Sequence, residues 1–181
     1  MKIISGKLKG KTINVPKIKS LRPTTNIARK GLFDILNSRI DLKNKEILDL
    51  FSGTGIISFE FLSRGAKNVT AIEINKLLCK YIIKNSKLLN LKIELYNTDA
   101  LKFLNKTNKY FDIIFCDPPY NYEKYENLIN IIFERNLLKE RGLLIIEHSD
   151  KQNFSLFKYF IHSRNYGKTF FSFFSLDNTI F

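Results

Sequence analysis

Residues able to hold a metal ion or to form a disulfide are scarce in this sequence. The 181 residues include two cysteines and two histidines. Cys79 and Cys116 lie far apart within apolar segments, and no CxxC pair occurs. We therefore expect two reduced thiols in the core of a protein from a reducing compartment, and no metal site.

Long hydrophobic runs are also absent. No apolar run approaches the roughly 20 residues that a membrane-spanning helix needs, and residues 1–6 lack the apolar stretch of a secretory signal. The sequence therefore favours a soluble, cytoplasmic protein with no membrane partner. Because 44% of the residues are hydrophobic, the chain can bury a sizeable core, and we expect a single domain over 1–181 that acts as a monomer.

Acidic residues are few relative to basic ones. The chain has 30 Lys and Arg against 17 Asp and Glu, which gives a formal net charge of +13 and a pI near 9.7. This excess favours a polyanionic partner, because each phosphate that a cation neutralises releases condensed counterions. Compositional drift is the alternative explanation, since Lys, Asn and Ile are all abundant, as in proteins encoded by A/T-rich codons.

From residue 46 onward, short β-rich apolar runs alternate with helical patterns. Such alternation indicates a parallel sheet with crossover helices. Strands are expected over 46–51, 69–73, 93–97, 112–116 and 143–147, and helices over 54–63, 76–89 and 122–133. The nearly continuous hydrophobicity of the strands favours a sheet covered on both faces.

The two ends of the chain complete the expected fold. The aromatic-rich runs 154–160 and 169–175 flank the turn signal Asn165-Tyr166-Gly167, which suggests an antiparallel pair with phenylalanines in the core. Residues 2–15 resemble a lysine-studded hairpin, and a helix is expected over 23–38 because Pro23 suits a first turn. The fold class is thus α/β, with a mostly parallel seven-stranded, Rossmann-like sheet, helices on both faces and an antiparallel C-terminal strand.

The segment 47–58 has the pattern of a strand, a glycine-containing turn and the start of a helix. Gly53 and Gly55 leave the backbone open to a ligand. Either Ser52 or Thr54 can cap the helix through its hydroxyl. The turn by itself is a weak indication of a ligand site.

Three acidic residues make that indication more specific. Asp49 precedes the turn, Glu73 ends the next predicted strand, and Asp99 follows the third. Open α/β sheets bind ligands at the carboxyl ends of their parallel strands, and these acids lie there. Glu73 can accept hydrogen bonds from both hydroxyls of a ribose, and Asp99 can bind an adenine amino group. The alternative is that all three are ordinary caps or turn residues.

This arrangement fits S-adenosylmethionine (SAM) better than a dinucleotide. A dinucleotide site has three glycines at a helix end that faces pyrophosphate. Here the turn has two glycines and an aspartate before it, which suits a ligand that carries a sulfonium and an ammonium instead of phosphates.

The predicted strand 112–116 is followed by the tetrapeptide Asp117-Pro118-Pro119-Tyr120. Two consecutive prolines fix φ and extend the preceding residue, so that the Asp117 carboxylate and the Pro118 carbonyl are held rigidly. These two acceptors can bind both N–H groups of an exocyclic base amine and localise its lone pair for methyl transfer. Tyr120 can stack on an extruded base. The alternative is a proline turn that merely ends a strand.

In this combination the sequence resembles the amino-methyltransferases of DNA and RNA bases. More narrowly, the order of Gly6 and Gly10, then Leu21-Arg22-Pro23-Thr24-Thr25, then Leu32-Phe33, then the segment 49–55 resembles the RsmD family of bacterial 16S ribosomal RNA guanine-N2 methyltransferases. The resemblance covers nearly the whole chain. It implies SAM as methyl donor with no metal, the N2 of one guanine in 16S rRNA as acceptor, and the small ribosomal subunit as partner.

The resemblance also implies roles for individual residues, within a basic N-terminal extension (1–40) and a SAM-binding catalytic core (41–181). The catalytic loop would consist of Asp117, Pro118, Pro119 and Tyr120. SAM contacts are expected from Asp49, Phe51, Ser52, Gly53, Thr54, Gly55, Glu73, Ile74, Asp99 and Ala100. RNA contacts are expected from Lys7, Lys9, Lys11, Arg22, Thr24 and Arg29. The chain departs from the family pattern at Ile27, where a basic residue is usual, and at Lys30, where a glutamate is usual.

Three other functions are open. A DNA adenine-N6 methyltransferase would use the same loop, but sequence-specific DNA enzymes usually carry an added recognition domain, whereas folded RNA supplies recognition through its own shape. A non-catalytic ribosome-assembly protein would be expected to have lost Asp117, Tyr120 or the glycine turn, and all are present. A small-molecule methyltransferase would leave the basic extension and the tetrapeptide unexplained.

Overall fold

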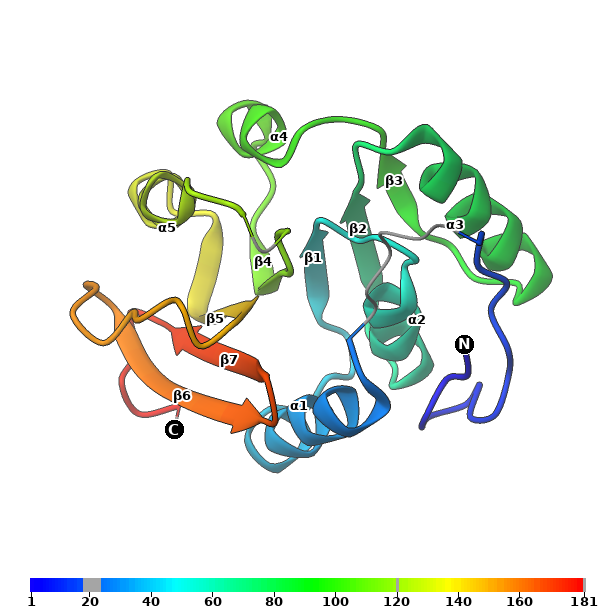
Figure 1. Cartoon of the computed structure of the whole chain (residues 1–181), viewed down its shortest axis with the longest axis horizontal. Helices are drawn as coiled ribbons and strands as arrows, with labels where there is room; N and C mark the ends of the chain where they lie inside the picture. Colours follow the sequence, from blue (N-terminus) through cyan, green and yellow to red (C-terminus); the bar gives the residue numbers. More distant parts are fainter. Residues whose placement is uncertain (18–23, 120, 181) are drawn as a thin grey trace.

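A seven-stranded sheet forms the centre of the protein (Figure 1). The computed structural model describes residues 1–17, 24–119 and 121–180. The strands lie in the order β3-β2-β1-β4-β5-β7-β6. Their bounds are β1 Glu46–Leu50, β2 Asn68–Ile72, β3 Glu94–Tyr96, β4 Phe111–Cys116, β5 Leu138–His148, β6 Phe160–Tyr166 and β7 Thr169–Phe174. Strands β1 to β5 run parallel, and β7 is antiparallel to both of its neighbours.

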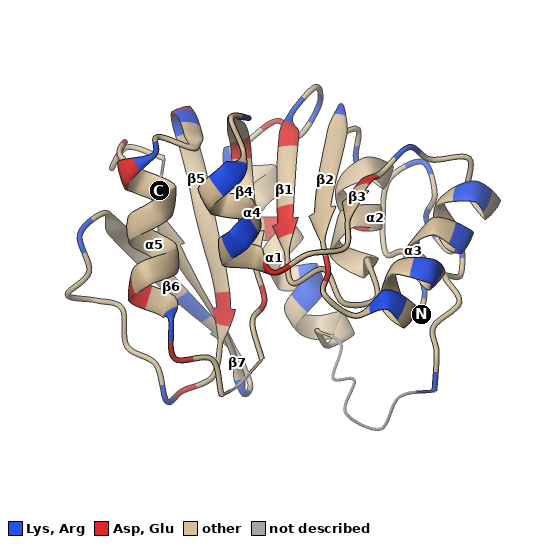
Figure 2. Cartoon of the chain, turned by 90° about the horizontal axis from the view of Figure 1, so that it is seen from above, with Lys and Arg blue, Asp and Glu red and all other residues tan. Residues whose placement is uncertain are grey.

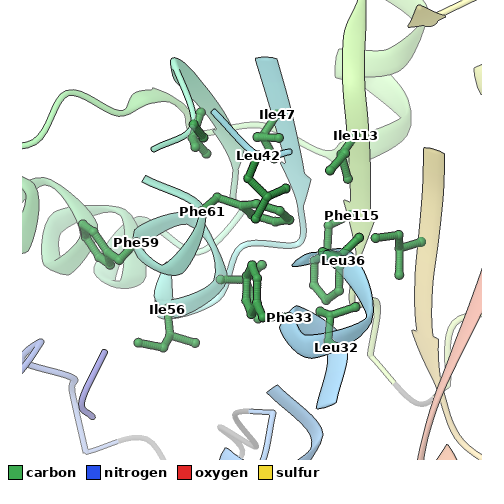
Figure 3. Packing of buried hydrophobic residues seen from close by; sticks show 14 of the residues in the cluster. Leu32, Phe33, Leu36, Leu42, Ile47, Ile56, Phe59, Phe61, Ile113 and Phe115 are labelled. Carbon is green, nitrogen blue, oxygen red and sulfur yellow. The ribbon is translucent and has the colours of Figure 1, made fainter. Parts of the chain in front are cut away.

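Helices cover both faces of this sheet (Figure 1). They are α1 (Asn26–Arg39), α2 (Ile56–Ser63), α3 (Lys76–Leu88), α4 (Ala100–Lys106) and α5 (Tyr125–Glu134). Side chains of α1, α2 and α3 pack on alternate strand residues such as Ile113 and Phe115 (Figure 3). Those of α4 and α5 pack on the residues between, such as Ile114 and Cys116, in a second core. The central strands β1, β4 and β5 are therefore buried on both faces over their apolar residues, as their continuous hydrophobicity predicts, whereas the edge strands β3 and β6 are partly exposed.

The fold class and the antiparallel C-terminal strand are confirmed, but the predicted bounds of one strand in the C-terminal pair are wrong. The first strand of the C-terminal pair spans Phe160–Tyr166 and not 154–160. Amide-to-carbonyl bonds from Phe157 to Phe154 and from Phe160 to Phe157 close successive turns there and take up the groups that a strand would use. The phenylalanines Phe154, Phe171, Phe173 and Phe174 are buried, as expected for core residues.

Residues 2–15 form an irregular arm instead of the regular hairpin that the sequence suggests. The two sides of the arm meet in one isolated antiparallel bridge, between Lys2 and Thr12. Some amides donate across the arm, as from Ile3 to the Lys11 carbonyl. Others donate to the carbonyl and the hydroxyl of Ser63, the last residue of α2. Gly6 permits this close approach, because a Cβ on it would lie 2.0 Å from the Ser63 carbonyl oxygen.

Cys79 and Cys116 are buried and unbridged, in agreement with the prediction of two core thiols. No helix of the described residues is long and apolar enough to cross a bilayer. The same residues contain no cluster of side chains that could hold a metal ion.

Candidate active site

The turn after β1 has left-handed backbone at Phe51 (φ 60°), Gly53 (φ 54°) and Gly55 (φ 76°). Bulky residues rarely adopt such a φ, so Phe51 is held there by its surroundings. A side chain at Gly55 would be crowded, because a Cβ would lie 3.0 Å from Ile82 and 3.2 Å from Phe59. The turn thus needs glycine at position 55 for two separate reasons.

Gly55 is also the N-cap of α2 and has no side chain to offer the helix. The hydroxyl of Thr54 accepts a hydrogen bond from the Ile56 amide, the first of the helix, at 3.4 Å. The Ser52 hydroxyl instead donates to the Asp49 carbonyl at 2.7 Å, since the tight turn directs it back toward β1. Of the two residues expected to cap α2, Thr54 therefore bonds to the start of the helix and Ser52 does not.

Glu73 ties this turn to the end of β2. Its Oε2 accepts a hydrogen bond from the Gly53 amide (2.8 Å), and its Oε1 accepts one from the Asn75 amide (2.7 Å). The Asn97 amide group, after β3, donates to the carbonyls of Glu73 and Ile74. Burial raises the pKa of Glu73 above its usual range. The ends of β1, β2 and β3 therefore form one hydrogen-bonded edge.

A cleft of about 280 Å³ opens along this edge. It brings together several of the predicted cofactor and catalytic residues, and is lined by Phe51, Gly53, Ile72, Glu73, Ile74, Thr98, Asp99, Ala100, Asp117 and Pro119. A narrower cavity of about 50 Å³ shares Phe51, Gly53 and Asp117 with the cleft, and reaches Thr24, Asp49, Ser52 and Thr54. Asp99 also caps α4, because its Oδ1 accepts from the Lys102 amide at 3.0 Å.

Asp49 is the most deeply buried of these acids, at 1% exposure. Its Oδ2 accepts a hydrogen bond from the hydroxyl of Ser58, in the first turn of α2. Burial raises the pKa of Asp49 to about 7, even though the Ser58 bonds lower it. Sequence reasoning missed Ser58, although a lone serine in the apolar run after the glycine turn was a usable signal.

Asp117 follows β4 directly, and its amide bonds to the Leu50 carbonyl at 3.4 Å. Within the described part of the chain, its carboxylate accepts no hydrogen bond, although it lines both cavities. Burial raises its pKa well above the usual range, and the neighbouring Glu147 and Asp49 raise it further. Asp117 is therefore an acceptor for which the described residues supply no donor.

The rest of the tetrapeptide is placed in part. Pro118 is buried and Pro119 exposed, and the Pro119 carbonyl accepts from the Tyr122 amide at 2.8 Å, which closes a turn after the prolines. Tyr120, expected to stack on the base, lies outside the described residues.

Glu147 and Tyr122 lie at this edge and were missed by sequence reasoning. Glu147 ends the predicted fifth strand and accepts a hydrogen bond from the Thr24 hydroxyl (2.7 Å). The Tyr122 ring packs edge-on against Phe51 at 5.2 Å, and its buried hydroxyl has no hydrogen-bond partner among the described residues. For Glu147 the usable signal was its position at the carboxyl end of a parallel strand.

The residues expected to contact RNA do not form one surface beside the site. Lys7, Lys9 and Lys11 are exposed, but the arm that carries them is held at the last residue of α2, the end away from the glycine turn. Thr24 is buried in the narrow cavity. Arg22 lies outside the described residues.

The prediction that Arg29 faces RNA is wrong. Arg29 is fully buried, its Nε lies 3.2 Å from Glu60 Oε1, and its Nη2 donates to the Lys2 carbonyl (2.8 Å). Glu60 also pairs with Arg64 and accepts from the Ile4 amide. The arginine turns inward because α2 offers a buried carboxylate, which locks the N-terminal arm and α1 onto α2.

The described residues of the edge fit the chemistry of SAM. The residues that line the two cavities include Asp49, Glu73, Asp99 and Asp117 and no Lys or Arg, which suits a cationic ligand better than one with phosphates. At Gly53 a Cβ would have only the Phe51 carbonyl within 4 Å, at 3.8 Å, so a side chain there would occupy open space in the cleft. Figure 2 shows acidic residues at the arrowheads of β1 and β5.

Similar proteins share both sequence and fold with this chain. The family model described as Conserved hypothetical protein 95 matches residues 1–175. The Ribosomal RNA small subunit methyltransferase D of Buchnera aphidicola subsp. Acyrthosiphon pisum (strain APS) is 41% identical over 153 residues, which are 83% of this chain and 79% of that protein. The solved structure of the Escherichia coli protein yhhF has a TM-score of 0.84 and 27% identity, and covers 96% of each chain.

A more distant structure shows the shared fold alone. The 16S rRNA N2 methyltransferase RsmC of T. thermophilus, in complex with AdoMet and guanosine, has a TM-score of 0.71 and 18% identity, and the match covers 89% of this chain and 46% of that one.

Proposed function

Since the chain belongs to the RsmD family of SAM-dependent methyltransferases, we propose that it methylates the exocyclic N2 amine of one guanine in 16S ribosomal RNA. The Buchnera relative is named as a ribosomal RNA small subunit methyltransferase, which supports a ribosomal substrate. The net charge of +13 supports a polyanionic one. We propose the small ribosomal subunit as the partner.

The observation that carries this proposal is the state of Asp117. The residue is half-buried, its carboxylate accepts no hydrogen bond from the described residues, and burial raises its pKa. A partly desolvated carboxylate without a donor is costly, and a substrate that supplies N–H groups removes that cost. An exocyclic amine supplies two, one for the Asp117 carboxylate and one for the Pro118 carbonyl.

These two acceptors also explain how the amine becomes a nucleophile. Its lone pair is delocalised into the ring, and two hydrogen bonds to fixed acceptors favour the geometry in which the pair is localised on nitrogen. The prolines hold both acceptors in place, so the rate gain comes from positioning. The raised pKa of Asp117 also suits it to accept the proton that the amine loses after transfer.

The cofactor residues have complementary roles. SAM, when bound, supplies an electrophilic methyl group on a sulfonium. Glu73 is positioned to accept hydrogen bonds from ribose hydroxyls and Asp99 from an adenine amine, because both carboxylates line the cleft. Asp49 supplies a buried negative charge at the narrow end, near the glycine turn. Ile74, at 67% exposure, offers an apolar surface for a ring to pack on.

The substitution Asp117→Ala tests this assignment. We expect SAM binding by calorimetry to stay near the wild-type Kd, since Asp117 contacts the methyl acceptor, while methyl transfer to small subunits falls by about a hundredfold or more. Asp34→Ala, at an exposed position of α1, is the matched control and should leave both quantities unchanged. Full transfer activity in the Asp117 variant would overturn the proposed role.

A further inference from the structure

Glu147 lies beside Asp117 on the same face of the sheet. Parallel strands β4 and β5 pair Phe115 with Ile145 and Cys116 with Ile146, so the next residues, Asp117 and Glu147, are neighbours. Phe115 and Ile145 belong to the core under α1 and α2. Since side chains alternate along a strand, Asp117 and Glu147 point toward that same side, where Asp49 also lies.

The Glu147 carboxylate is held in place by one hydrogen bond and can accept further ones. It is 7% exposed, and the hydroxyl of Thr24 donates to its Oε2 at 2.7 Å. No other hydrogen bond to the carboxylate occurs within the described residues. Thr24 lines the narrow cavity together with Asp49 and Asp117, so this carboxylate is fixed next to the catalytic acceptor. Burial raises the pKa of Glu147 to about 7.

A carboxylate held in this position can distinguish bases by the ring nitrogen that lies next to the exocyclic amine. Three nucleobases carry an exocyclic amine beside a ring nitrogen of the pairing edge. In adenine and cytosine that ring nitrogen is an acceptor, whereas guanine presents an N1–H donor. A carboxylate accepts from N1–H and repels an acceptor lone pair, so its presence next to Asp117 separates guanine from the other two.

We propose that Glu147 is the specificity-determining residue of this enzyme and accepts the N1–H of the target guanine, while Asp117 and the Pro118 carbonyl bind the N2 amine. The proposal rests on the proposed function, because it assumes that a base amine occupies the Asp117 acceptor. Thr24 is a positioning residue that fixes the orientation of the Glu147 carboxylate. The same contact accounts for the exclusion of adenine, whose N6 amine would otherwise fit the tetrapeptide.

Methyl transfer to the base 2-aminopurine tests whether Glu147 recognises the N1–H of guanine or only helps to bind the base. It keeps the 2-amino group of guanine, but its N1 is an acceptor. We would map the methylated guanosine, place 2-aminopurine riboside at that position by RNA ligation, assemble small subunits, and measure single-turnover methyl transfer. We expect the wild type to methylate guanine at least tenfold faster than 2-aminopurine, because a hydrogen bond to a charged group is replaced by repulsion.

The variant Glu147→Gln should reverse part of this preference. A glutamine amide can donate to the N1 of 2-aminopurine, so the ratio of guanine to 2-aminopurine rates should fall by about tenfold or more. Thr24→Val is the matched control: it removes the bond to Glu147 but keeps the carboxylate, so it should slow both substrates and leave their ratio near the wild-type value. SAM binding checks the folding of each variant.

Equal wild-type rates on the two bases would overturn the proposal without use of any variant. An unchanged ratio in a Glu147→Gln protein that binds SAM normally would also overturn it, while leaving the proposed function intact. If the wild type methylates no guanine in small subunits, the proposed function itself fails, and the role of Glu147 fails with it.

Discussion

Burial, more than residue identity, sets the chemistry of single residues at this site. Asp49, Asp117 and Glu147 are ordinary carboxylates in sequence, yet each lies at the carboxyl edge of the sheet with a pKa that desolvation has raised. Each one is costly to ionise without a partner. An incoming cation or N–H group removes that cost, so ligand binding and the charge state of these acids are coupled.

Ser58→Ala should shift the pH dependence of SAM binding. Ionised Asp49 attracts a cationic ligand, so its contribution to SAM affinity rises as pH increases through its pKa of about 7. The hydrogen bond from the Ser58 hydroxyl stabilises the ionised form. Without it the pKa of Asp49 rises, the midpoint of the affinity curve moves to higher pH, and the Kd for SAM at pH 7 increases. Calorimetry from pH 6 to 9 measures this shift.

Ser86→Ala provides the matched control for that experiment. Ser86 is a helical serine whose hydroxyl donates to a backbone carbonyl in α3, so its loss should not move the midpoint. SAM itself titrates in the same way with the wild type and both variants. A difference in midpoint between these proteins therefore reports the pKa of Asp49. Identical midpoints in the wild type and Ser58→Ala would contradict the role given to Ser58.

Sequence reasoning places most of the acids but not their partners. Asp49, Glu73, Asp99 and Asp117 line the two cavities because strand ends can be located from hydrophobic runs, and parallel strand ends meet at one edge. Arg29 illustrates the limit. A charged residue in a helix is usually solvated, and only the tertiary packing of α1 on α2 shows the buried Glu60 that pairs with it.

At the scale of elements, the glycine turn and α2 connect the cofactor cleft to the core. Gly55→Ala should lower the free energy of unfolding by about 2–4 kcal/mol. Alanine would be strained at the positive φ of this position, and its Cβ would make tight contacts with Ile82 and Phe59. Its displacement of the turn should also weaken SAM binding. Urea denaturation and calorimetry measure the two effects.

Gly167→Ala separates strain from packing in that comparison. Gly167, in the β6–β7 turn, also has a positive φ (68°), but a Cβ there would meet nothing within 4 Å. Its alanine variant should therefore cost about 1–2 kcal/mol of backbone strain and leave the Kd for SAM unchanged. Equal costs for the two substitutions would mean that packing at Gly55 contributes nothing.

The second element-scale prediction concerns the buried ion pair between Arg29 and Glu60, which joins α1 to α2. Glu60→Gln leaves Arg29 buried without a full counter-charge, so it should destabilise the fold by about 3 kcal/mol or more. It should also speed hydrogen exchange of the Ile4 amide, which donates to Glu60 Oε1. Glu134→Gln, at an exposed position of α5, should change neither urea midpoint nor exchange rate.

The first four strands of the parallel sheet are predicted well from sequence. The predicted strands at β1, β2, β3 and β4 begin and end within a residue or two of their observed bounds. Continuous apolar runs mark all of these strands except β3, which is mostly exposed. β5 starts earlier than predicted, at Leu138, which pairs with Phe111. Residues 139–141 after it are charged, so no continuous apolar run indicates this part of the strand in the sequence. The helix α4 is missing from the prediction because seven residues are too few to show a helical apolar pattern.

At the scale of the whole molecule, basic residues are carried by helices next to a site whose lining is acidic. Figure 2 shows Lys and Arg in α3 and α4, whereas the described residues that line the two cavities include neither. Such a division suits an enzyme that attracts a polyanion over a broad surface and admits an uncharged base together with a cationic cofactor.

The double variant Lys9→Ala, Lys11→Ala tests the N-terminal arm as part of that surface. Both side chains are exposed, and each one that contacts a phosphate should contribute roughly 0.7–0.9 to the slope of log K against log salt. We expect weaker binding of 16S RNA and a flatter slope in filter-binding titrations. Lys139→Ala is the control: it removes a lysine that is paired with Asp112 and should leave the slope unchanged. If the double variant has the same slope as the wild type, the arm makes no contact with the phosphates of the RNA.

The central claim is that this edge of the sheet methylates the N2 of guanine in ribosomal RNA. The most direct measurement is transfer of tritium from labelled SAM to purified small subunits, naked 16S RNA and duplex DNA, followed by nucleoside analysis of the products. We expect the label in N2-methylguanosine from one or both ribosomal substrates and none in DNA. Label in N6-methyladenine, or no transfer by a protein that binds SAM tightly, would contradict the claim.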